Sequence, residues 1–418
     1  MSKNTDPIRM LHFADLHIGM ENYGRLDPAT GIHGRVLDFL RRFDEVIEYG
    51  LAHDVDLVLF AGDAFKTRDP NPMYQREFAR RIKRLSDAGV PTVLLVGNHD
   101  LPAMEKKATS MDIFRTLAVP NVTVGWRDEL HRIETKRGPV QVACVPYPMR
   151  QRLLAREEFR GKNLEELDRA LTDIVGDIVR GLAAQIDPAI PAVLAGHFTV
   201  GGAVFGSERS VMIGSDVVVL KSVLADRAWD HVALGHIHKH QELTGGAYPA
   251  IVYPGSLERI DFGEERDPKG FCWVELARGE TRWRFVEVKA RPFVTVWADV
   301  RDSDDPTQVV LDEIELRDVT GAVVRVNVKL KAHQEAELRE KDIAAALKDA
   351  GYIAAISRDV EREARARLGG ATPEGLAPTE LLERYLESKG TEPERAARLM
   401  ECAKQFMAEW SEQALGSR

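Results

Sequence analysis

The 418-residue sequence predicts an α/β fold: a mainly parallel sheet covered by helices, followed by a smaller α+β unit and a pair of terminal helices. Three observations lead to this expectation. Short apolar runs alternate with amphipathic helical patterns over residues 8–96, which is typical of parallel sheets. Five apolar runs stop abruptly at Asp, Asn or His. Near Arg291 the pattern changes, and no residues of metal-ligand type accompany the strands expected beyond it.

The first elements follow one another as strand, helix, strand, helix, strand. Residues 8–14, 57–61 and 92–96 are apolar on both faces, as expected for buried strands. Amphipathic patterns at 36–51 and 74–85 predict the helices between them. Ligands of such sheets bind in the crevice beyond the carboxyl ends of the strands, where the loops after these strands begin.

Later segments extend this architecture. An amphipathic pattern predicts a helix over residues 164–178. Short apolar runs predict further strands at 140–145, 192–195, 232–234, 271–276 and 283–288.

We place domain boundaries after residues 290 and 360, which gives units 1–290, 291–360 and 361–418. In the middle unit, Val324, Val326 and Val328 alternate with polar residues, the period-two signature of a half-exposed strand, and we expect a small α+β domain. In the last unit, Thr391 and Glu394 have the spacing of a capping box at a helix start. The apolar stripe of that helix either packs on this chain or docks on a partner.

Bulk composition limits the function. No apolar stretch is long enough to cross a bilayer, and the first residues lack the apolar core of a signal peptide, so we expect a cytoplasmic protein. Cys144, Cys272 and Cys402 lie outside any C-x-x-C pattern, which argues against a thiolate zinc site. The net charge of −9 argues against a generally basic nucleic-acid coat, although a local basic surface beside metal ions could hold a phosphate backbone.

Polar residues follow the five apolar runs in the motifs D-x-H, G-D, G-N-H-D, G-H and G-H-x-H. Gathered at one edge of a sheet, they supply oxygen and nitrogen ligands without sulfur, which suit Mn, Fe or Zn better than Ca. Seven ligands are too many for one open catalytic ion, but a bridging Asp63 gives each of two ions four. The candidate ligands are Asp15, His17, Asp63, Asn98, His197, His236 and His238.

The natural division places Asp15, His17 and His238 on one ion, Asn98, His197 and His236 on the other, and Asp63 on both. Two ions about 3.5–4 Å apart clamp a phosphoryl group and lower the pKa of a bridging water. His99, which is not needed as a ligand, is placed to protonate the leaving oxygen, and we expect Asp100 to hold it. The expected reaction is hydrolysis of a phosphate ester.

Each motif alone has a simpler explanation. D-x-H occurs often by chance, and G-N-H-D could be an ordinary turn. A single histidine such as His197 is more often structural than a ligand. The ordered conjunction of five motifs outweighs these separate explanations. The remaining histidines fit no such pattern and are interpreted as structural or surface residues: His12, His33, His53, His131, His231, His240 and His333.

The ordered set of motifs resembles the signature of the calcineurin-like metallophosphoesterases over about residues 8–290. The resemblance implies a two-layer αβ sandwich, a dinuclear metal site and phosphoester hydrolysis. Narrower features are similar to the SbcD subunits of bacterial SbcCD nucleases, relatives of archaeal and eukaryotic double-strand-break repair nucleases: F-A-D-L-H-I-G, A-L-G-H-I-H-K and P-G-S-L-E-R-I-D-F-G-E-E. In that family a small capping domain follows the catalytic domain.

This narrower resemblance implies a DNA nuclease that uses Mn²⁺, or alternatively Mg²⁺, as a 3′-to-5′ exonuclease on double-stranded ends and an endonuclease on single strands and hairpins. It implies that the C-terminal helices bind an SMC-like ATPase, in a nucleoid-associated heterotetramer that contains a homodimer of this chain. The family's metal ligands carry over to all seven positions, and its proton donor to His99. One departure is Lys66, where archaeal and eukaryotic members often have a second histidine, so one transition-state contact is in doubt.

The residues themselves leave the substrate open. Arg25, Lys66, Arg68 and Arg209 lie in expected loops near the site and could meet DNA phosphates, although solvated surface charge explains any one of them. One alternative is a small-molecule phosphodiesterase or nucleotidase with the same site, which leaves the terminal helices unexplained. Another is a non-catalytic scaffold that only binds the ATPase, and an intact ligand set with His99 argues against it.

Overall fold

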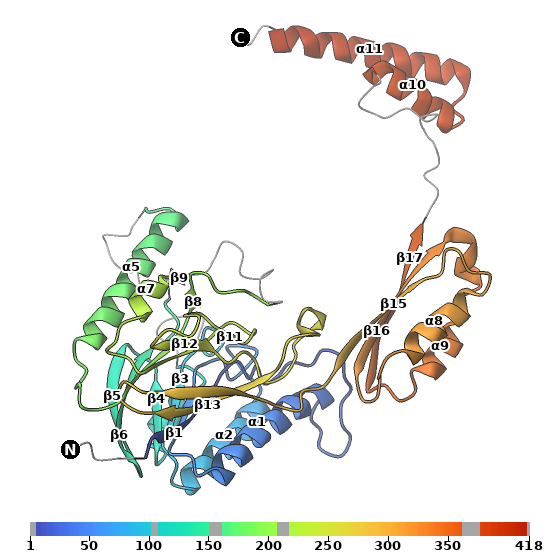
Figure 1. Ribbon diagram of the computed structural model, residues 1–418. Coiled ribbons are helices and arrows are strands. Elements are labelled where there is room, and N and C mark those ends of the chain that lie inside the picture. The colour runs from blue at the N-terminus through green and yellow to red at the C-terminus, as the bar shows by residue number, and fades with distance from the viewer. Residues whose placement is uncertain (1–5, 102–107, 150–160, 207–216, 362–376, 416–418) are drawn as a thin grey trace.

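Two six-stranded sheets pack face to face in the first unit of the chain (Figure 1). The computed structural model describes residues 6–101, 108–149, 161–206, 217–361 and 377–415. The first sheet has the order β14 (Arg282–Glu287), β13 (Gly270–Leu276), β1 (Ile8–Phe13), β2 (Leu57–Phe60), β3 (Thr92–Leu95) and β4 (Val122–Gly125). The second has the order β11 (Gln241–Glu242), β12 (Ala250–Tyr253), β10 (His231–Gly235), β7 (Ala192–His197), β6 (Gly138–Val145) and β5 (Glu129–Thr135).

The predicted α/β class is confirmed, but the expectation of one mainly parallel sheet is corrected to two. The inner strands of each sheet are parallel, whereas β13, β14, β5 and β11 run antiparallel to their neighbours. Between the sheets, Met10 and Val93 of the first sheet share one apolar core with Val142 and Val252 of the second. A strand buried on both faces has the same apolar sequence pattern whether a helix or another sheet covers it. Periodicity therefore could not reveal that a second sheet covers the first.

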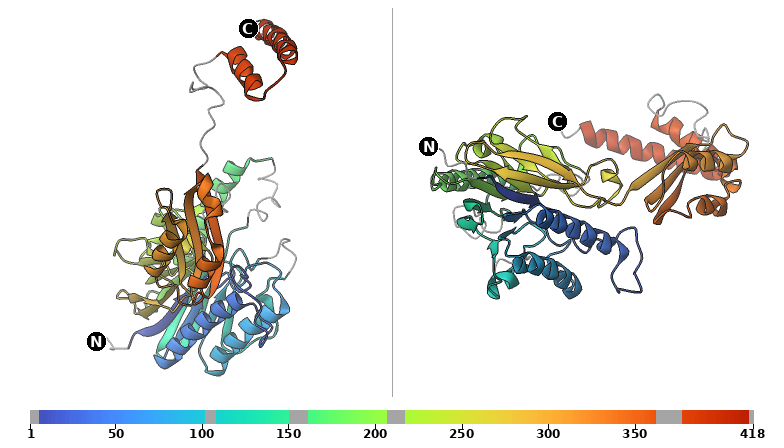
Figure 2. Two further views of the ribbon diagram at one scale, coloured as in Figure 1. Left: turned by 90° about the vertical axis from the view of Figure 1, so that its right-hand side faces the viewer. Right: turned by 60° about the horizontal axis from the view of Figure 1, so that its bottom comes forward.

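Helices cover the outer faces of the two sheets (Figure 2). On the first sheet, Phe43 of one helix packs against Phe13 of β1, and Phe78 of another packs against Phe60 of β2. A third helix packs against the outer face of the second sheet through Val175 and Val179. These three helices are α1 (Gly34–Ala52), α2 (Pro72–Asp87) and α5 (Leu164–Ala183). The smaller elements are α3 (Asp112–Thr116), α7 (Lys221–Leu224), the 3-10 turn η2 (Phe262–Glu264) and the strand pair β8 (Thr199–Val200) and β9 (Val218–Val219).

Residues 293–361, here called the cap unit, form a three-stranded parallel sheet with helices on one face (Figure 2). Val326 and Val328 are buried on the helix side while Lys329 is exposed, as the alternating pattern predicts. On the same sheet, Trp297 is 64% exposed. The elements are β15 (Phe293–Asp299), α8 (Pro306–Glu315), β16 (Val323–Lys331), η3 (Ala332–Ala336), α9 (Glu340–Ala346) and β17 (Tyr352–Glu361).

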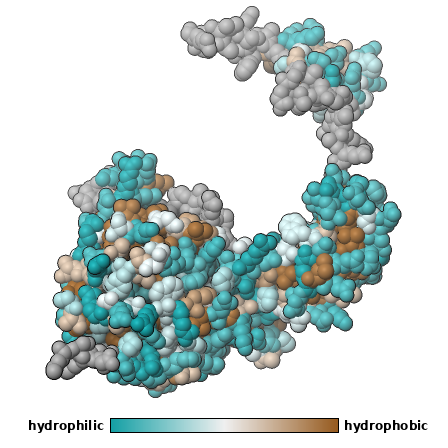
Figure 3. All heavy atoms as spheres, in the orientation of Figure 1, coloured by the Kyte–Doolittle hydropathy of each residue, from teal (hydrophilic) through white to brown (hydrophobic). Residues whose placement is uncertain are grey.

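The last described residues form a helical pair, α10 (Pro378–Ser388) and α11 (Pro393–Leu415). Large apolar side chains stay exposed on this pair, namely Tyr385, Leu399 and Phe406. On the rest of the face shown in Figure 3, hydrophobic residues form small patches among hydrophilic ones. Among the helices of the described residues, none is both long and apolar enough to span a bilayer.

Two buried histidines lie between the sheets. The Nε2 atom of His12 on β1 lies 3.1 Å from the carbonyl oxygen of Leu234 on β10, and its ring meets the ring of His231 edge-on. Burial lowers the pKa of His231 to about 3. Burial, together with His231, also lowers the pKa of His12 well below its ordinary value. Both rings are therefore neutral in the folded protein at neutral pH.

We expect the substitution His231→Phe to make the folded protein less sensitive to acid. The unfolded chain takes up a proton near the ordinary histidine pKa of about 6.5, whereas folded His231 stays neutral down to about pH 3. Stability is therefore lost as the pH falls below about 6.5, by up to about 1.4 kcal/mol per pH unit from this histidine. Urea unfolding at pH 7 and pH 5 measures the loss, with the exposed His333→Gln variant as control. An equal loss in wild type and both variants would contradict the expectation.

Candidate metal centre

The loops that follow strands of both sheets converge at one end of the sandwich and bring the seven candidate ligands together. Asp15, His17, Asp63 and Asn98 follow β1, β2 and β3 of the first sheet. His197 ends β7, and His236 and His238 follow β10 of the second sheet. Within the described residues, possible ligand atoms gather in three overlapping groups: Asp15, His17 and His238; His17, Asp63 and His99; and Asp63, His197 and His236. We call the first and third groups the two clusters, and the middle group links them through His17 and Asp63.

The backbone bends sharply at several of these residues. Asp15, His17, Asp63 and His236 have φ angles of 53°, 42°, 62° and 97°, a region that non-glycine residues enter at an energetic cost. The neighbouring loops hold this conformation, since the Asp15 N–H donates to Gly62 O at 3.0 Å and the His17 N–H to Asp63 O at 3.1 Å. Strained backbone of this kind is typical of functional sites.

The glycine in G-N-H-D is required by close packing. A Cβ atom on Gly97 would lie 2.1 Å from the Oδ1 atom of Asp63. On Gly62, which has a φ of 99°, it would lie 2.4 Å from the Nδ1 atom of His197. The glycines of these motifs therefore make room for the ligand side chains to meet.

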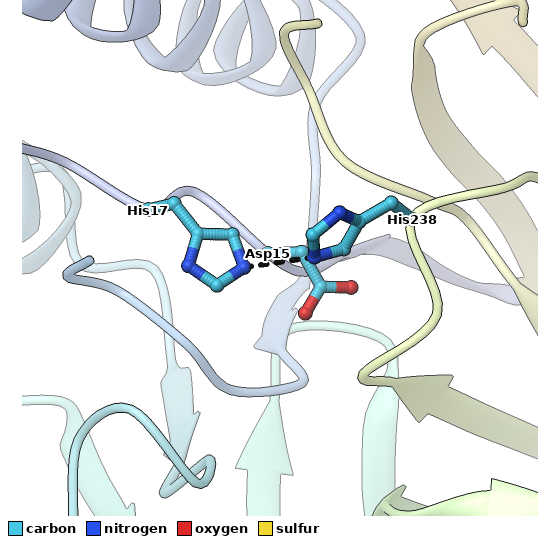
Figure 4. A group of neighbouring side chains, drawn as sticks. All are labelled: Asp15, His17 and His238. Atoms are coloured by element: carbon cyan, nitrogen blue, oxygen red, sulfur yellow. Dashed lines mark hydrogen bonds between the residues drawn. The ribbon is translucent and has the colours of Figure 1, made fainter. Parts of the chain in front are cut away.

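The first cluster is shown in Figure 4, where the rings of His17 and His238 point toward each other beside Asp15. Their Nε2 atoms lie 3.0 Å apart. The Nδ1 atom of His238 lies 3.0 Å from the Glu264 carboxylate, so the ring donates there and its Nε2 lone pair faces the cluster. Two ring nitrogens and a carboxylate that converge in this way fit a divalent transition metal.

The second cluster is centred on the side-chain oxygen of Asn98. This Oδ1 atom lies 3.0 Å from both His197 Nε2 and His236 Nδ1. The Nδ1 atom of His197 lies 2.7 Å from the carbonyl oxygen of Ala61 and donates to it, which leaves Nε2 as the ligand atom. The arrangement is again one of imidazole nitrogens and oxygens around a common point.

Asp63 lies between the clusters. Its Oδ2 atom is 3.4 Å from His197 Nε2 and 3.8 Å from His17 Nε2, so a single carboxylate oxygen reaches toward both. Its Oδ1 atom accepts a hydrogen bond of 2.8 Å from the His99 N–H. This geometry is what a bridging ligand requires.

The charged groups of the site are arranged around the Asp63 carboxylate. Burial works against ionisation of Asp63, but His197 and His99 hold the pKa of Asp63 well below its ordinary value. Although burial lowers it, the Asp63 carboxylate raises the pKa of His197 to about 9. Burial, together with His238, lowers the pKa of His17 well below its ordinary value. One carboxylate is thus ionised at the centre of the site, beside a neutral imidazole that can bind metal.

His99 is fixed beside the clusters by a contact that the sequence did not predict. Its Nδ1 atom lies 2.7 Å from the carbonyl oxygen of Lys66, and its ring meets His17 edge-on. Asp100 was expected to hold His99, but its carboxylate contacts backbone groups instead. The buried Asp100 carboxylate accepts from the backbone N–H groups of Asp63, Ala64 and Gly97 at 2.9, 3.0 and 3.1 Å, so it ties the loop after β3 to the loop after β2.

The basic residues expected near the site are placed less tightly. Arg25 and Arg68 are exposed, and Lys66 is partly buried, in loops of the first unit. Only Lys66 has a described link to the site, through its carbonyl oxygen and His99. Arg209 lies outside the described residues.

Sequence reasoning missed two residues behind His238. Glu264 and Lys269 are both buried, and their side chains form an ion pair of 2.8 Å. Burial opposes it, but Lys269 and His238 hold the pKa of Glu264 well below its ordinary value. The signal was the acidic end of D-F-G-E-E, which matched a family motif but has no ligand-type spacing.

The fold and the ligand-type side chains gathered at the strand ends are those expected of a metal-dependent phosphoesterase. The family model for calcineurin-like phosphoesterases matches residues 8–240. The SbcD component of the Rhodobacter capsulatus nuclease SbcCD is 31% identical, and the match covers 65% of this chain and 67% of the relative. The SbcD component of the Bacillus subtilis nuclease is 26% identical over 69% and 72%. The Haloferax volcanii DNA double-strand break repair protein Mre11 is 27% identical over 77% of this chain and 61% of its own length.

The chain belongs to the calcineurin-like phosphoesterases, and within them to the group of SbcD and Mre11 proteins. Members of this family hydrolyse phosphoesters with bound metal ions, and the reaction class expected from the motifs is thereby confirmed. The match spans about three fifths of the Haloferax relative, so the activity of a whole relative is not transferred to this chain by similarity alone.

Proposed function

We propose that this chain is the nuclease component of a DNA-repair complex and hydrolyses DNA phosphodiester bonds with two divalent metal ions, most readily Mn²⁺, with Mg²⁺ as the second choice. The observation that carries the proposal is the position of Asp63, whose Oδ2 atom lies 3.4 Å from His197 Nε2 and 3.8 Å from His17 Nε2. The names of the SbcD and Mre11 relatives support DNA as the substrate. We infer 3′-to-5′ exonuclease action on duplex ends and endonuclease action on single strands and hairpins.

When bound, two metal ions would supply a nucleophile at neutral pH and neutralise charge on the phosphoryl group. The seven ligands would hold them in the division expected from the sequence, with Asp63 shared. His99 would protonate the leaving oxygen. Because its Nδ1 atom faces the Lys66 carbonyl, the proton would come from Nε2 of the doubly protonated ring. Arg25, Lys66, Arg68 and Arg209 would contact the DNA backbone.

The experiment that tests this function compares substrates. The purified chain is incubated with Mn²⁺ and end-labelled linear duplex, circular single-stranded DNA or a small model phosphodiester, each with a chelator control. We expect both DNA substrates to be cleaved and the chelator to stop cleavage. Hydrolysis of the model diester with DNA untouched, even after adding an SMC-like ATPase, would favour the small-molecule alternative instead.

The C-terminal pair is proposed as the docking site for an SMC-like ATPase. The exposed apolar side chains of Tyr385, Leu399 and Phe406 support this role, since a solvent-exposed apolar stripe suits a partner helix. We also propose a homodimer of this chain within a heterotetramer, and units divided after residues 290 and 360.

Deletion of residues 379–418 is expected to abolish ATPase binding and to spare Mn²⁺-dependent DNA cleavage. The deletion removes α10 and α11 but leaves both sheets and all seven candidate ligands. Co-purification with the tagged ATPase and the nuclease assay measure the two effects. A truncated protein that still binds the ATPase, or that is inert on every DNA substrate, would contradict this division of roles.

A further inference from the structure

One short segment contacts both a candidate metal ligand and the cap unit. It comprises residues 258–265, between β12 and β13, and includes the turn η2; we call it the coupling segment. Its Glu264 side faces His238, while its Phe262 and Glu265 side faces the strands of the cap unit. Glu264 lies next to Glu265 and two positions after Phe262, so neither side can move far without the other.

On the metal side, Glu264 holds His238 from behind. The carboxylate is fully buried, with one oxygen 3.0 Å from His238 Nδ1. The other oxygen lies 2.8 Å from Lys269 Nζ and accepts from the Ile260 N–H at 2.9 Å. Lys269 Nζ also donates to the His238 carbonyl oxygen at 3.2 Å. The ring and the backbone of His238 are thus anchored to the same buried ion pair, and a shift of Glu264 would turn the ligand nitrogen.

On the cap side, the segment packs against β15 and β16. The ring of Phe262 packs edge-on against Phe293, with 4.9 Å between centroids, and the guanidinium of Arg325 lies 4.3 Å from the same ring. The Glu265 carboxylate accepts from the Thr295 N–H at 3.0 Å and from the Thr295 hydroxyl. Three residues of the cap unit therefore fix the position of η2.

Two partly buried arginines, each with several hydrogen-bond partners, hold this junction together. Arg259 donates to the carbonyl oxygens of Glu264, Asp267 and Arg291 at 3.2, 3.1 and 3.1 Å. Arg291 in turn forms a two-pronged ion pair with Asp38 of α1, at 2.6 and 2.7 Å. Its remaining nitrogen donates to Gly321 O, just before β16, at 2.8 Å. Separating the units would break the ion pair of the buried Asp38 carboxylate with Arg291 and the hydrogen bonds of Arg291 and Arg259, so the cap unit and the segment are expected to move together.

We propose that the coupling segment transmits the seating of the cap unit to His238, so that loosening the cap weakens metal binding at the Asp15–His17–His238 cluster and spares the other cluster. This inference rests on the proposed metal site. The second cluster is held from a different side, since His197 donates to Ala61 O and Asp63 accepts from the His99 N–H. Phe262 and Glu265 are therefore positioning residues that act through Glu264.

The test is calorimetric titration of the full-length chain with Mn²⁺ alone. Phe262→Ala removes a cap contact, and Glu265→Gln weakens another while changing a single atom, which keeps the test open if the first variant does not fold. Each variant is expected to lower the affinity for one of the two ions, on the order of 3- to 10-fold. Glu264→Gln acts directly on His238 and is expected to weaken the same ion about 10- to 100-fold. Trp297→Ala, on the exposed surface of the same cap strand, is the matched control.

The electron paramagnetic resonance spectrum of bound Mn²⁺ shows whether the metal pair is kept, and agreement with Glu264→Gln, which acts on His238, assigns the weakened ion. At two equivalents, wild type should give the spin-coupled signal of a metal pair, and the Phe262 and Glu265 variants a larger share of isolated Mn²⁺. Two unchanged affinities in all variants, or an equal loss at both ions, would overturn the coupling and leave the metal site standing. Failure of the wild-type chain to bind two ions would overturn the proposed site, and the coupling with it.

Discussion

Replacing His99 by alanine is expected to reduce DNA cleavage by about 10²- to 10⁴-fold, the usual contribution of a general acid, while both metal ions remain bound. The imidazole lies beside the clusters rather than within the division of seven ligands, and its Nδ1 atom is occupied by the Lys66 carbonyl. Its backbone N–H, which donates to Asp63, is kept in the variant. The rate of Mn²⁺-dependent cleavage and the metal content of the purified protein measure the two effects.

The exposed His333→Ala variant controls for the loss of a histidine elsewhere. If the metal content falls in step with activity, His99 is a ligand and its assignment as proton donor is wrong.

Replacing Asp63 by alanine is expected to have the largest effect on metal binding, because it removes a ligand from both ions. We expect both affinities to fall by more than about 100-fold, the upper range for residues that only support a ligand. Asp63→Asn, which tolerates the φ of 62° and keeps one oxygen, should lose less. Calorimetry with Mn²⁺ measures both variants.

Asp87→Asn, an exposed carboxylate of α2, is the matched control for charge. One ion bound with full affinity in the Asp63→Ala protein would mean that this carboxylate serves a single cluster. The proposed bridge would then be abandoned, although the ligand clusters themselves would remain.

The strand ends of the site could be predicted because each motif has a local physical cause. An apolar run that stops at a polar residue marks the carboxyl end of a buried strand, and Gly97 is required where Asp63 packs closely. The first effect operates within a few residues of sequence, whereas the second joins two motifs that follow neighbouring strands. The seven candidate ligands therefore meet where the motifs indicated, although they come from two sheets rather than one.

What the sequence could not show depends on contacts between distant segments. Glu264 lies 26 positions after His238, and nothing in its spacing marks it as the residue behind that ring. Lys269 is buried beside Glu264 and the His238 carbonyl oxygen, whereas lysine is usually exposed. Asp100 was expected to hold its neighbour His99, but its oxygens accept from three backbone N–H groups of two loops. Tertiary packing decided each of these contacts.

Anomalous diffraction from crystals soaked in Mn²⁺ shows whether two metal ions share Asp63. We expect two anomalous peaks about 3.5–4 Å apart, one among Asp15, His17 and His238 and the other among Asn98, His197 and His236, with Asp63 between them. A single peak at saturating Mn²⁺, or two peaks of which only one contacts Asp63, would contradict this expectation.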